Sequence, residues 1–235
     1  MIPIPRALAL SLLLLMPGLA EARHCRPKSG AVAADTSAIT TAPFLARMKE
    51  IGVSTIIRYY DHEDETLPGK TLRAPERDLI AGSGFRLLVV FQHRNDRLPT
   101  FTPERGAADA ARSLDLAREN AQPGGSAVYF GVDGPWGERE RPLVRAYFRE
   151  AAPAIRAAGY RIGIYGGGYM CRAMAEEGLA DLCWLANARS WPGYAERLAD
   201  RRSWRLRQAL PETCGGRAVD FNFPSSPGAD FGQFR

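Results

Sequence analysis

The run at residues 85–92 (FRLLVVFQ) decides the fold class of this chain. It is almost continuously apolar, which is typical of a parallel strand that is buried on both faces. Similar apolar or β-branched runs occur at 54–60, 127–133 and 160–165, and stretches with helical spacing separate them. Strands that alternate with helices indicate right-handed βαβ units and a parallel sheet.

The alternation continues over most of the chain and predicts eight strands. We expect them at residues 32–35, 54–60, 85–92, 127–133, 160–165, 182–187, 204–208 and 217–223. Eight strands favour a closed barrel over an open doubly wound sheet, so the predicted class is α/β, a compact (β/α)8 TIM-like barrel. The chain of 235 residues is at the small end for this fold. Some late helices should therefore be short or missing.

Residues 1–22 have the pattern of a signal peptide. Arg6 gives a positive start, 7–16 are apolar, and Ala20-Glu21-Ala22 offers a cleavage site between small residues. The apolar run is shorter than the roughly 20 residues that a membrane helix needs. We therefore expect residues 23–235 to form one secreted or periplasmic domain with no stable membrane insertion after cleavage. An uncleaved anchor is the alternative.

Four cysteines lie in the predicted domain: Cys25, Cys171, Cys183 and Cys214. An even number in an exported chain suggests disulfides, and four cysteines allow three connectivities. We favour Cys171–Cys183, which closes a short loop, and Cys25–Cys214, which would hold the new N-terminus. The cysteines are scattered and no histidine lies at ligand spacing, so we expect neither a metal nor another cofactor.

The charge of the chain is mildly positive, with a formal net charge of +5. Such a balance favours contact with anionic cell-wall polymers or membranes. The densest basic stretch, at residues 197–207, has two interpretations: a solvated helix face that runs into an exposed strand, or a polyanion site. Nothing in the sequence resembles a nucleic-acid-binding module, so no nucleic-acid partner is expected.

Three of the predicted strands carry an aspartate at or near their ends: Asp35, Asp133 and Asp220. A carboxylate where a buried strand surfaces is costly unless it is paired, hydrogen-bonded or used. Each also has a structural interpretation: Asp35 as a helix or turn cap, Asp133 as a turn residue before Gly134, and Asp220 as a partner of Arg58. Three acids on distant strands nevertheless predict a shared site at one end of the barrel.

The other predicted strand ends at the same face are polar or aromatic. The complete ring comprises Asp35, Tyr59, Tyr60, Gln92, Asp133, Tyr165, Asn187, Gln208, Asp220 and Asn222. It contains no histidine, cysteine or lysine. Carboxylates and amides pair with sugar hydroxyls, and aromatic faces stack on pyranose rings. We assign substrate binding to Tyr60, Gln92, Tyr165, Asn187, Gln208 and Asn222.

Eight short segments, in this order, resemble a secreted bacterial family known as the glycoside-hydrolase-like domain, formerly a domain of unknown function. The segments are ADTSAITT, IIRYY, GFRLLVVFQ, AVYFGVDG, YRIGIYGGG, CWLANA, WRLRQ and VDFNF, which span residues 34–223. This family looks like a compact relative of the family-25 lysozymes. The resemblance implies a (β/α) barrel with an acidic pocket and a cell-wall glycan as its ligand.

The resemblance also carries over to single residues. Asp35 matches the first-strand aspartate of the lysozyme relatives, Asp133 the first acid of their Asp-x-Glu pair, and Asp220 the acid of the last strand. The glutamate of that pair, the expected general acid, corresponds to Pro135. Because proline cannot donate a proton to the leaving oxygen, either another acid acts or the barrel binds without cutting. Glu138, Glu140 or one of the remaining aspartates could take the part.

Two functions follow as hypotheses. In the first, an exported glycoside-hydrolase-like protein acts on or binds a peptidoglycan-like polymer, with Asp133 as the central catalytic residue. Asp35 and Asp220 would complete this catalytic group, positioning substrate or tuning the pKa of Asp133. In the second, the chain is a non-catalytic carbohydrate-binding or structural barrel of the envelope that has lost its general acid. Fold alone cannot choose between them.

Overall fold

The computed structural model describes residues 25, 29–62, 67–214 and 216–235. Within this part of the chain, eight strands close into one barrel in chain order. The strands are β1 (Ala33–Asp35), β2 (Thr55–Tyr60), β3 (Arg86–Phe91), β4 (Ala127–Val132), β5 (Arg161–Gly166), β6 (Leu182–Leu185), β7 (Leu206–Cys214) and β8 (Arg217–Pro224). The predicted TIM-like α/β barrel is confirmed. The predicted signal peptide, residues 1–22, lies outside the described residues.

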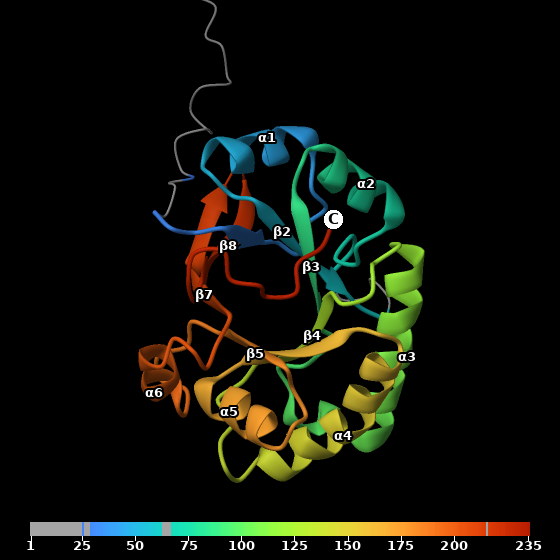
Figure 1. Ribbon diagram of the computed structural model, residues 1–235, viewed down its shortest axis with the longest axis vertical. Coiled ribbons are helices and arrows are strands. Elements are labelled where there is room, and N and C mark those ends of the chain that lie inside the picture. Colours follow the sequence, from blue (N-terminus) through green and yellow to red (C-terminus); the bar gives the residue numbers. More distant parts are fainter. Residues whose placement is uncertain (1–24, 26–28, 63–66, 215) are drawn as a thin grey trace, which may run out of the picture.

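A helix follows each of the first six strands and packs on the outside of the barrel (Figure 1). Among the described residues, none of these helices is long and apolar enough to span a membrane. The helices are α1 (Ala42–Glu50), α2 (Ala74–Gly82), α3 (Pro103–Glu119), α4 (Arg141–Ala157), α5 (Gly168–Glu176) and α6 (Tyr194–Ala199), with a 3-10 turn, η2, at Leu98–Thr100.

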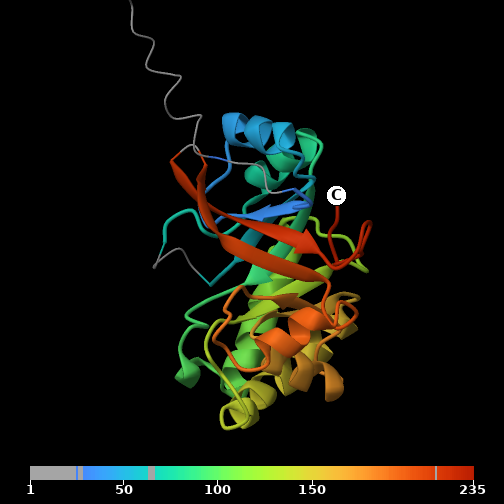
Figure 2. The ribbon, with the colours of Figure 1, turned by 90° about the vertical axis from the view of Figure 1, so that its left-hand side faces the viewer.

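The last strand runs against the others, which corrects the expectation of an all-parallel sheet. Strands β1 to β7 are parallel to one another, whereas β8 is antiparallel to both β7 and β1. The β7–β8 hairpin lies as a long twisted ribbon beside β1 (Figure 2). Only residues 215–216 join the two strands, so no helix can intervene. The expected shortening of late helices is confirmed by this hairpin and by the 6-residue α6.

The barrel has an inner and an outer apolar layer. Alternate residues of the strands fill the interior, among them Ile57, Leu88 and Trp184, and the remaining ones pack under the helices. Trp184 is buried and its indole donates to Asn222 Oδ1 at 2.7 Å. Because the strands are apolar on both faces, the polar residues that remain inside are held by hydrogen bonds.

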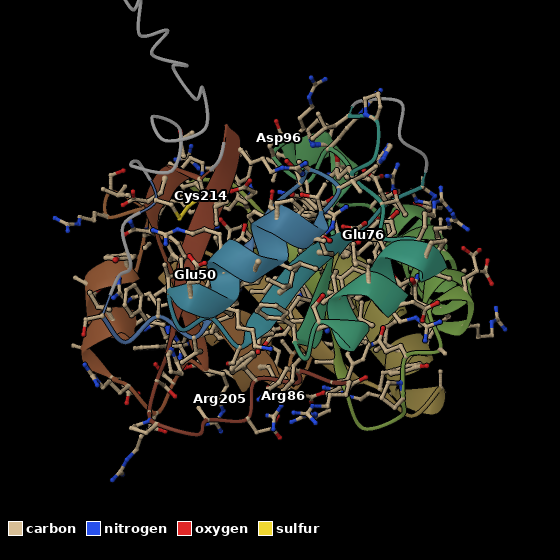
Figure 3. All side chains as sticks on the ribbon, turned by 90° about the horizontal axis from the view of Figure 1, so that it is seen from above. Glu50, Glu76, Arg86, Asp96, Arg205 and Cys214 are labelled. Carbon is tan, nitrogen blue, oxygen red and sulfur yellow. A yellow bond between two sulfur atoms is a disulfide. The ribbon has the colours of Figure 1, made fainter. Side chains whose placement is uncertain are left out.

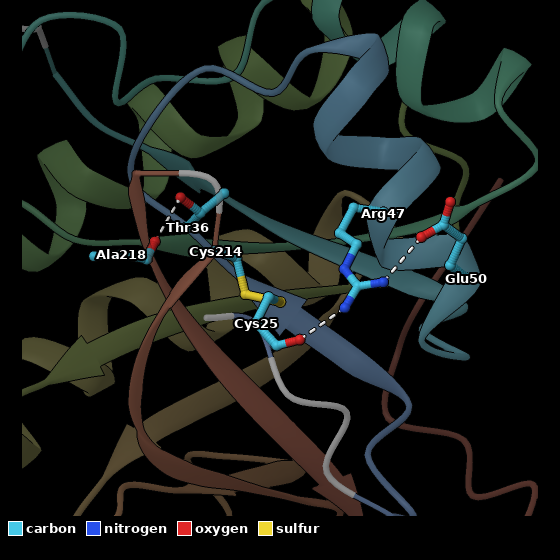
Figure 4. Close-up of a disulfide and its surroundings, with 6 residues drawn as sticks. All are labelled: Cys25, Thr36, Arg47, Glu50, Cys214 and Ala218. Carbon is cyan, nitrogen blue, oxygen red and sulfur yellow. Dashed lines mark hydrogen bonds and ion pairs between the residues drawn. A yellow bond between two sulfur atoms is a disulfide. The ribbon is translucent and has the colours of Figure 1, made fainter. Parts of the chain in front are cut away.

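Both disulfides form in the favoured pairing, Cys25–Cys214 and Cys171–Cys183. The first joins the segment that precedes β1 to the end of β7 (Figure 4). Arg47 of α1 donates to the carbonyl oxygen of Cys25 at 2.9 Å. Cys25 is therefore fixed to the barrel by one covalent bond and at least one hydrogen bond.

Helices α3 and α4 meet at a glycine, and this contact gives a testable prediction. A Cβ atom at Gly106 would lie 2.2 Å from the carbonyl oxygen of Tyr147, which is backbone and cannot turn aside. We expect Gly106→Ala to lower the free energy of unfolding by about 1–3 kcal/mol in a urea titration. The control is Gly82→Ala in α2, where a Cβ would meet nothing within 4 Å. Equal effects of the two changes would contradict this close packing.

Candidate functional site

Two aspartates lie side by side where β8 closes the barrel. Asp35 ends β1, and Asp220 of β8 is its partner in the antiparallel register. Asp35 is only 2% exposed, whereas Asp220 is half-buried. Gln208 of β7 donates its side-chain amide to both, at 3.1 Å to Asp220 Oδ2 and 3.4 Å to Asp35 Oδ2. The two carboxylates therefore share one donor.

Burial raises the pKa of Asp35 to about 7, and the negative charge of Asp220 adds to the effect. Hydrogen bonds from Asn222, Gln208 and Tyr59 act in the opposite direction and do not offset it. The Asn222 amide lies 2.7 Å from Asp35 Oδ2, and the Tyr59 hydroxyl 3.2 Å from Oδ1. Asp35 thus takes up a proton near neutral pH, as expected when two carboxylates share a poorly solvated site.

Arg58 does not neutralise this pair. Its guanidinium is fully buried on the outer face of β2 and binds Glu76 of α2, with Nε 2.7 Å from Oε1 and Nη2 3.0 Å from Oε2. It also donates to the carbonyl oxygen of Thr36 at 2.6 Å. The interpretation of Asp220 as the structural partner of Arg58 is therefore wrong, because Arg58 points away from the barrel interior.

Tyr165 connects the aspartate pair with Asp133. Its hydroxyl donates to Gln208 Oε1 at 2.8 Å. The pKa of Tyr165 is raised well above its ordinary value, first by burial and then by the charges of Asp133, Asp35 and Asp220 in that order. All three charges thus act on Tyr165, whereas the charge that raises the pKa of Asp35 is that of Asp220 and the one that raises the pKa of Asp133 is that of Asp96.

Asp133 lines an open cavity of about 510 Å³ at the C-terminal end of the strands. Gln92 donates to Asp133 Oδ2 at 3.0 Å, and the amide of Asp133 donates to the carbonyl oxygen of Asn95 at 3.0 Å. Burial, followed by the charge of Asp96, raises the pKa of the Asp133 carboxyl, against the Gln92 hydrogen bond and the charge of Lys70. The cavity is lined by Lys70, Gln92, Arg94, Asn95, Asp96, Arg97 and Asp133.

A larger cavity, of about 1050 Å³, opens at the other end of the barrel. Its lining includes Val32, which precedes β1, and Trp204, which precedes β7. No aspartate or glutamate of the described segments lines it. Size alone therefore does not identify the candidate site, and the acids select the smaller cavity. Figure 3 shows the two ends of the barrel, with Asp96, on the loop after β3, at one edge of the molecule and Arg86, the first residue of β3, at the opposite edge.

Two of the six residues assigned to substrate binding, Gln92 and Gln208, contact the acids directly, and a third, Tyr165, donates to Gln208. Asn222 is fully buried beneath Asp35, where it donates to the carboxylate and accepts from Trp184. Because it has no access to solvent, its contact with a substrate is excluded. Asn222 instead positions Asp35.

The assignment of Tyr60 to the site is wrong, whereas that of Asn187 stays a prediction. Tyr60 lies on the outer face of β2, is fully buried, and donates to Gln122 Oε1 at 3.0 Å. Asn187 is half-buried just after β6 and accepts a hydrogen bond at 3.1 Å from the hydroxyl of Tyr194, the first residue of α6. Tyr59 takes the place expected for Tyr60, because side chains alternate along a strand. The sequence could not show which of the two points inward, since both faces of β2 are largely apolar.

The two glutamates considered as replacement acids lie elsewhere. Glu138 is exposed and is bound by the Tyr169 hydroxyl and by Arg141, 3.4 Å away. Glu140 turns back on its own loop and accepts from the amide of Gly137 at 2.9 Å. Neither lines the Asp133 cavity. The other acid that lines this cavity is Asp96, on the loop after β3.

Two basic residues from loops, Lys70 and His93, were not among the residues predicted from the strand ends. Lys70, on the loop after β2, lies 3.2 Å from Asp61 Oδ2 and donates to the carbonyl oxygen of Gln92 at 2.5 Å. His93 binds the other oxygen of Asp61 through Nδ1 at 2.5 Å. These residues were missed because they lie in loops, where periodicity gives no signal. Over the described segments, no group of three histidine, cysteine, aspartate or glutamate side chains is arranged to hold a metal ion.

A model of one protein family matches residues 46–233, most of the chain. It describes the Rv2525c-like, glycoside hydrolase-like domain. The chain belongs to this family. The matched residues include seven of the eight barrel strands, and β1 with Asp35 precedes the matched region.

Two solved structures share this fold, and one curated protein is similar in sequence. This chain superposes on the Tat-secreted protein Rv2525c of Mycobacterium tuberculosis with a TM-score of 0.72 and 20% identity. The superposition covers 88% of this chain and 100% of Rv2525c. The autolysin LytC of Streptococcus pneumoniae gives 0.54 and 14%, over 82% and 46%. The uncharacterized protein YbfG of Bacillus subtilis is 29% identical over 67% of this chain. The match spans only 23% of YbfG.

Proposed function

We propose that this protein is exported and that its acidic cavity binds and hydrolyses a cell-wall glycan of the peptidoglycan type. The observation that carries the proposal is Asp133, a half-buried carboxyl whose pKa is raised and which lines an open cavity. A general acid must hold a proton near the working pH and must reach the substrate. Asp133 lines the cavity and its pKa is shifted in the direction that favours the protonated form, whereas Asp35 is buried.

The other acids have supporting parts in this proposal. Asp96 lines the same cavity and is the second carboxylate that glycoside hydrolysis requires, as base or charge stabiliser. Asp35 and Asp220 lie behind Gln208, and the charge of Asp220 helps to keep a proton on Asp35. Pro135 then needs no replacement on its own loop, because the proton donor is Asp133 itself.

Export and a cell-wall ligand are supported by relatives. Rv2525c is a Tat-secreted protein, and LytC is an autolysin whose structure is also known with a synthetic peptidoglycan ligand. The two disulfides of this chain agree with an oxidising compartment. These likenesses support the choice of substrate class for the first assay.

Release of reducing ends from purified peptidoglycan tests the proposal. We expect the protein to release them, with activity that falls as the pH rises above the pKa of Asp133. Asp133→Asn should abolish release, because the amide cannot donate a proton as the carboxylic acid does. The matched control is Asp115→Asn on the exposed face of α3, which removes the same charge far from the cavity.

A second candidate, a barrel that binds glycan without cutting it, is favoured by Pro135 at the position of the expected glutamate. It predicts saturable binding to peptidoglycan with no released ends, and weaker binding by Asp133→Asn. Full activity of Asp133→Asn would contradict the assignment of Asp133 as the donor. Absence of both binding and release would contradict the glycan function itself.

A further inference from the structure

The cavity of Asp133 has more positive than negative groups in its lining. Lys70, Arg94 and Arg97 stand against Asp96 and Asp133. Burial and the charge of Asp96 raise the pKa of Asp133, which disfavours its negative form. Hydroxyls and acetamido groups of a neutral sugar are recognised by amides and carboxylates. Two or three cations beside such groups indicate a ligand that also bears negative charge.

Lys70 is committed to the protein. Its ammonium lies 3.2 Å from Asp61, donates to the carbonyl oxygen of Gln92 and sits 5.2 Å above the ring of Tyr59. Only 11% of its side chain is exposed. Its charge is therefore shared with Asp61, and Lys70 serves mainly to fix the cavity wall. The cations that remain for a ligand are the two arginines.

Arg94 and Arg97 lie on one tight turn at the rim of the cavity. Arg94 has a φ of 56°, a left-handed conformation that is uncommon for arginine. Its carbonyl oxygen accepts from the amide of Arg97 at 3.1 Å and from the Thr100 hydroxyl at 2.8 Å. These bonds hold the turn so that both side chains border the same space.

The two guanidinium groups are available. Both residues are exposed, and neither has an ion pair with an acid of the segments that the structure describes. Arginine offers a planar fork of donors that matches a carboxylate in two parallel hydrogen bonds. A pair of such forks a few residues apart is well suited to one carboxylate on a sugar.

We propose that Arg94 and Arg97 form an anion subsite, and that the glycan bound at Asp133 carries a free carboxylate on the sugar in this cavity. The inference rests on the proposed function and deepens it, since it names an acidic rather than a neutral glycan. The carboxylate can belong to the lactyl ether of a peptide-free muramic acid or to the ring of a uronic acid. In both cases the group recognised is the same.

Binding of glycans with and without their carboxylate tests the subsite. The probes are peptide-free peptidoglycan fragments and oligogalacturonate, each compared with its own methyl ester by calorimetry. At low salt we expect the free acid of at least one probe to bind about tenfold more tightly than its ester, which is about 1.4 kcal/mol. The preferred probe identifies the source of the carboxylate. The preference should weaken as salt is added.

The variant Arg94→Ala with Arg97→Ala should remove this preference and leave binding of the esters within about twofold. Arg149→Ala with Arg202→Ala removes two exposed arginines elsewhere and should change nothing. Esters that bind as well as free acids would overturn the subsite and leave the glycan function standing. Failure of all four probes to bind would overturn both. A preference that survives in the Arg94–Arg97 variant would overturn the assignment to these residues.

Discussion

Glu76→Ala is expected to lower the free energy of unfolding by about 3–5 kcal/mol, measured by urea titration at neutral pH. The change leaves the guanidinium of Arg58 fully buried with no opposing charge. It also removes the acceptor for the amide of Thr40, 2.7 Å from Glu76 Oε1. Removing one partner of a buried pair is costly because the other cannot regain its water.

Two comparisons separate this effect from a general loss of charge. Glu50→Ala removes the acid of an exposed pair with Arg47, and we expect it to cost at most about 1 kcal/mol. The double change Arg58→Met with Glu76→Leu removes both charges, and we expect it to recover much of the stability. A Glu76→Ala variant that is no less stable than Glu50→Ala would contradict the account.

Asp35→Asn is expected to change the pH dependence of stability in a direction opposite to that of ordinary surface acids. The Asp35 carboxyl binds its proton more tightly in the folded chain, with a pKa of about 7, than in the unfolded chain, where it is 3.8. The stability that this provides is complete below the unfolded value and is lost as the pH rises through about 7. The asparagine variant has no such proton to lose.

The measurement is the free energy of unfolding at pH 5 and pH 8. From the two pKa values, the wild-type chain should lose about 2–3 kcal/mol more than Asp35→Asn between these conditions. The stability of Asp35→Asn relative to the wild type should therefore be higher at pH 8 than at pH 5. Asp115→Asn is the control and should follow the wild type. Parallel curves for wild type and Asp35→Asn would show that Asp35 titrates normally.

The barrel could be predicted from the sequence because apolar runs indicate its strands and the helical spacing of apolar residues indicates its helices. The direction of β8 could not, because a strand pattern has no polarity. Pro211 also hid the length of β7, which was expected to end at residue 208. A shift in the β7–β8 register between Gln208 and Pro211 accommodates the proline, which has no amide hydrogen to donate.

The site was predictable only as far as strands reach into it. The rule that strand ends gather at one face correctly brought Asp35, Asp133 and Gln208 to the same end of the barrel. The same rule could not tell Tyr59 from Tyr60, since β2 is buried on both faces. Lys70 and Asp96 come from loops, and only the folded barrel shows which loop residues border the cavity.

The disulfide between Cys25 and Cys214 makes most of the chain a covalent ring. The two cysteines are 189 positions apart, and all six helices and seven of the eight strands lie between them. A protease that cuts any single loop within this ring leaves both pieces attached to each other. Fragments separate only after a second cut or after reduction. A nicked barrel can therefore hold its parts together wherever reductants are scarce.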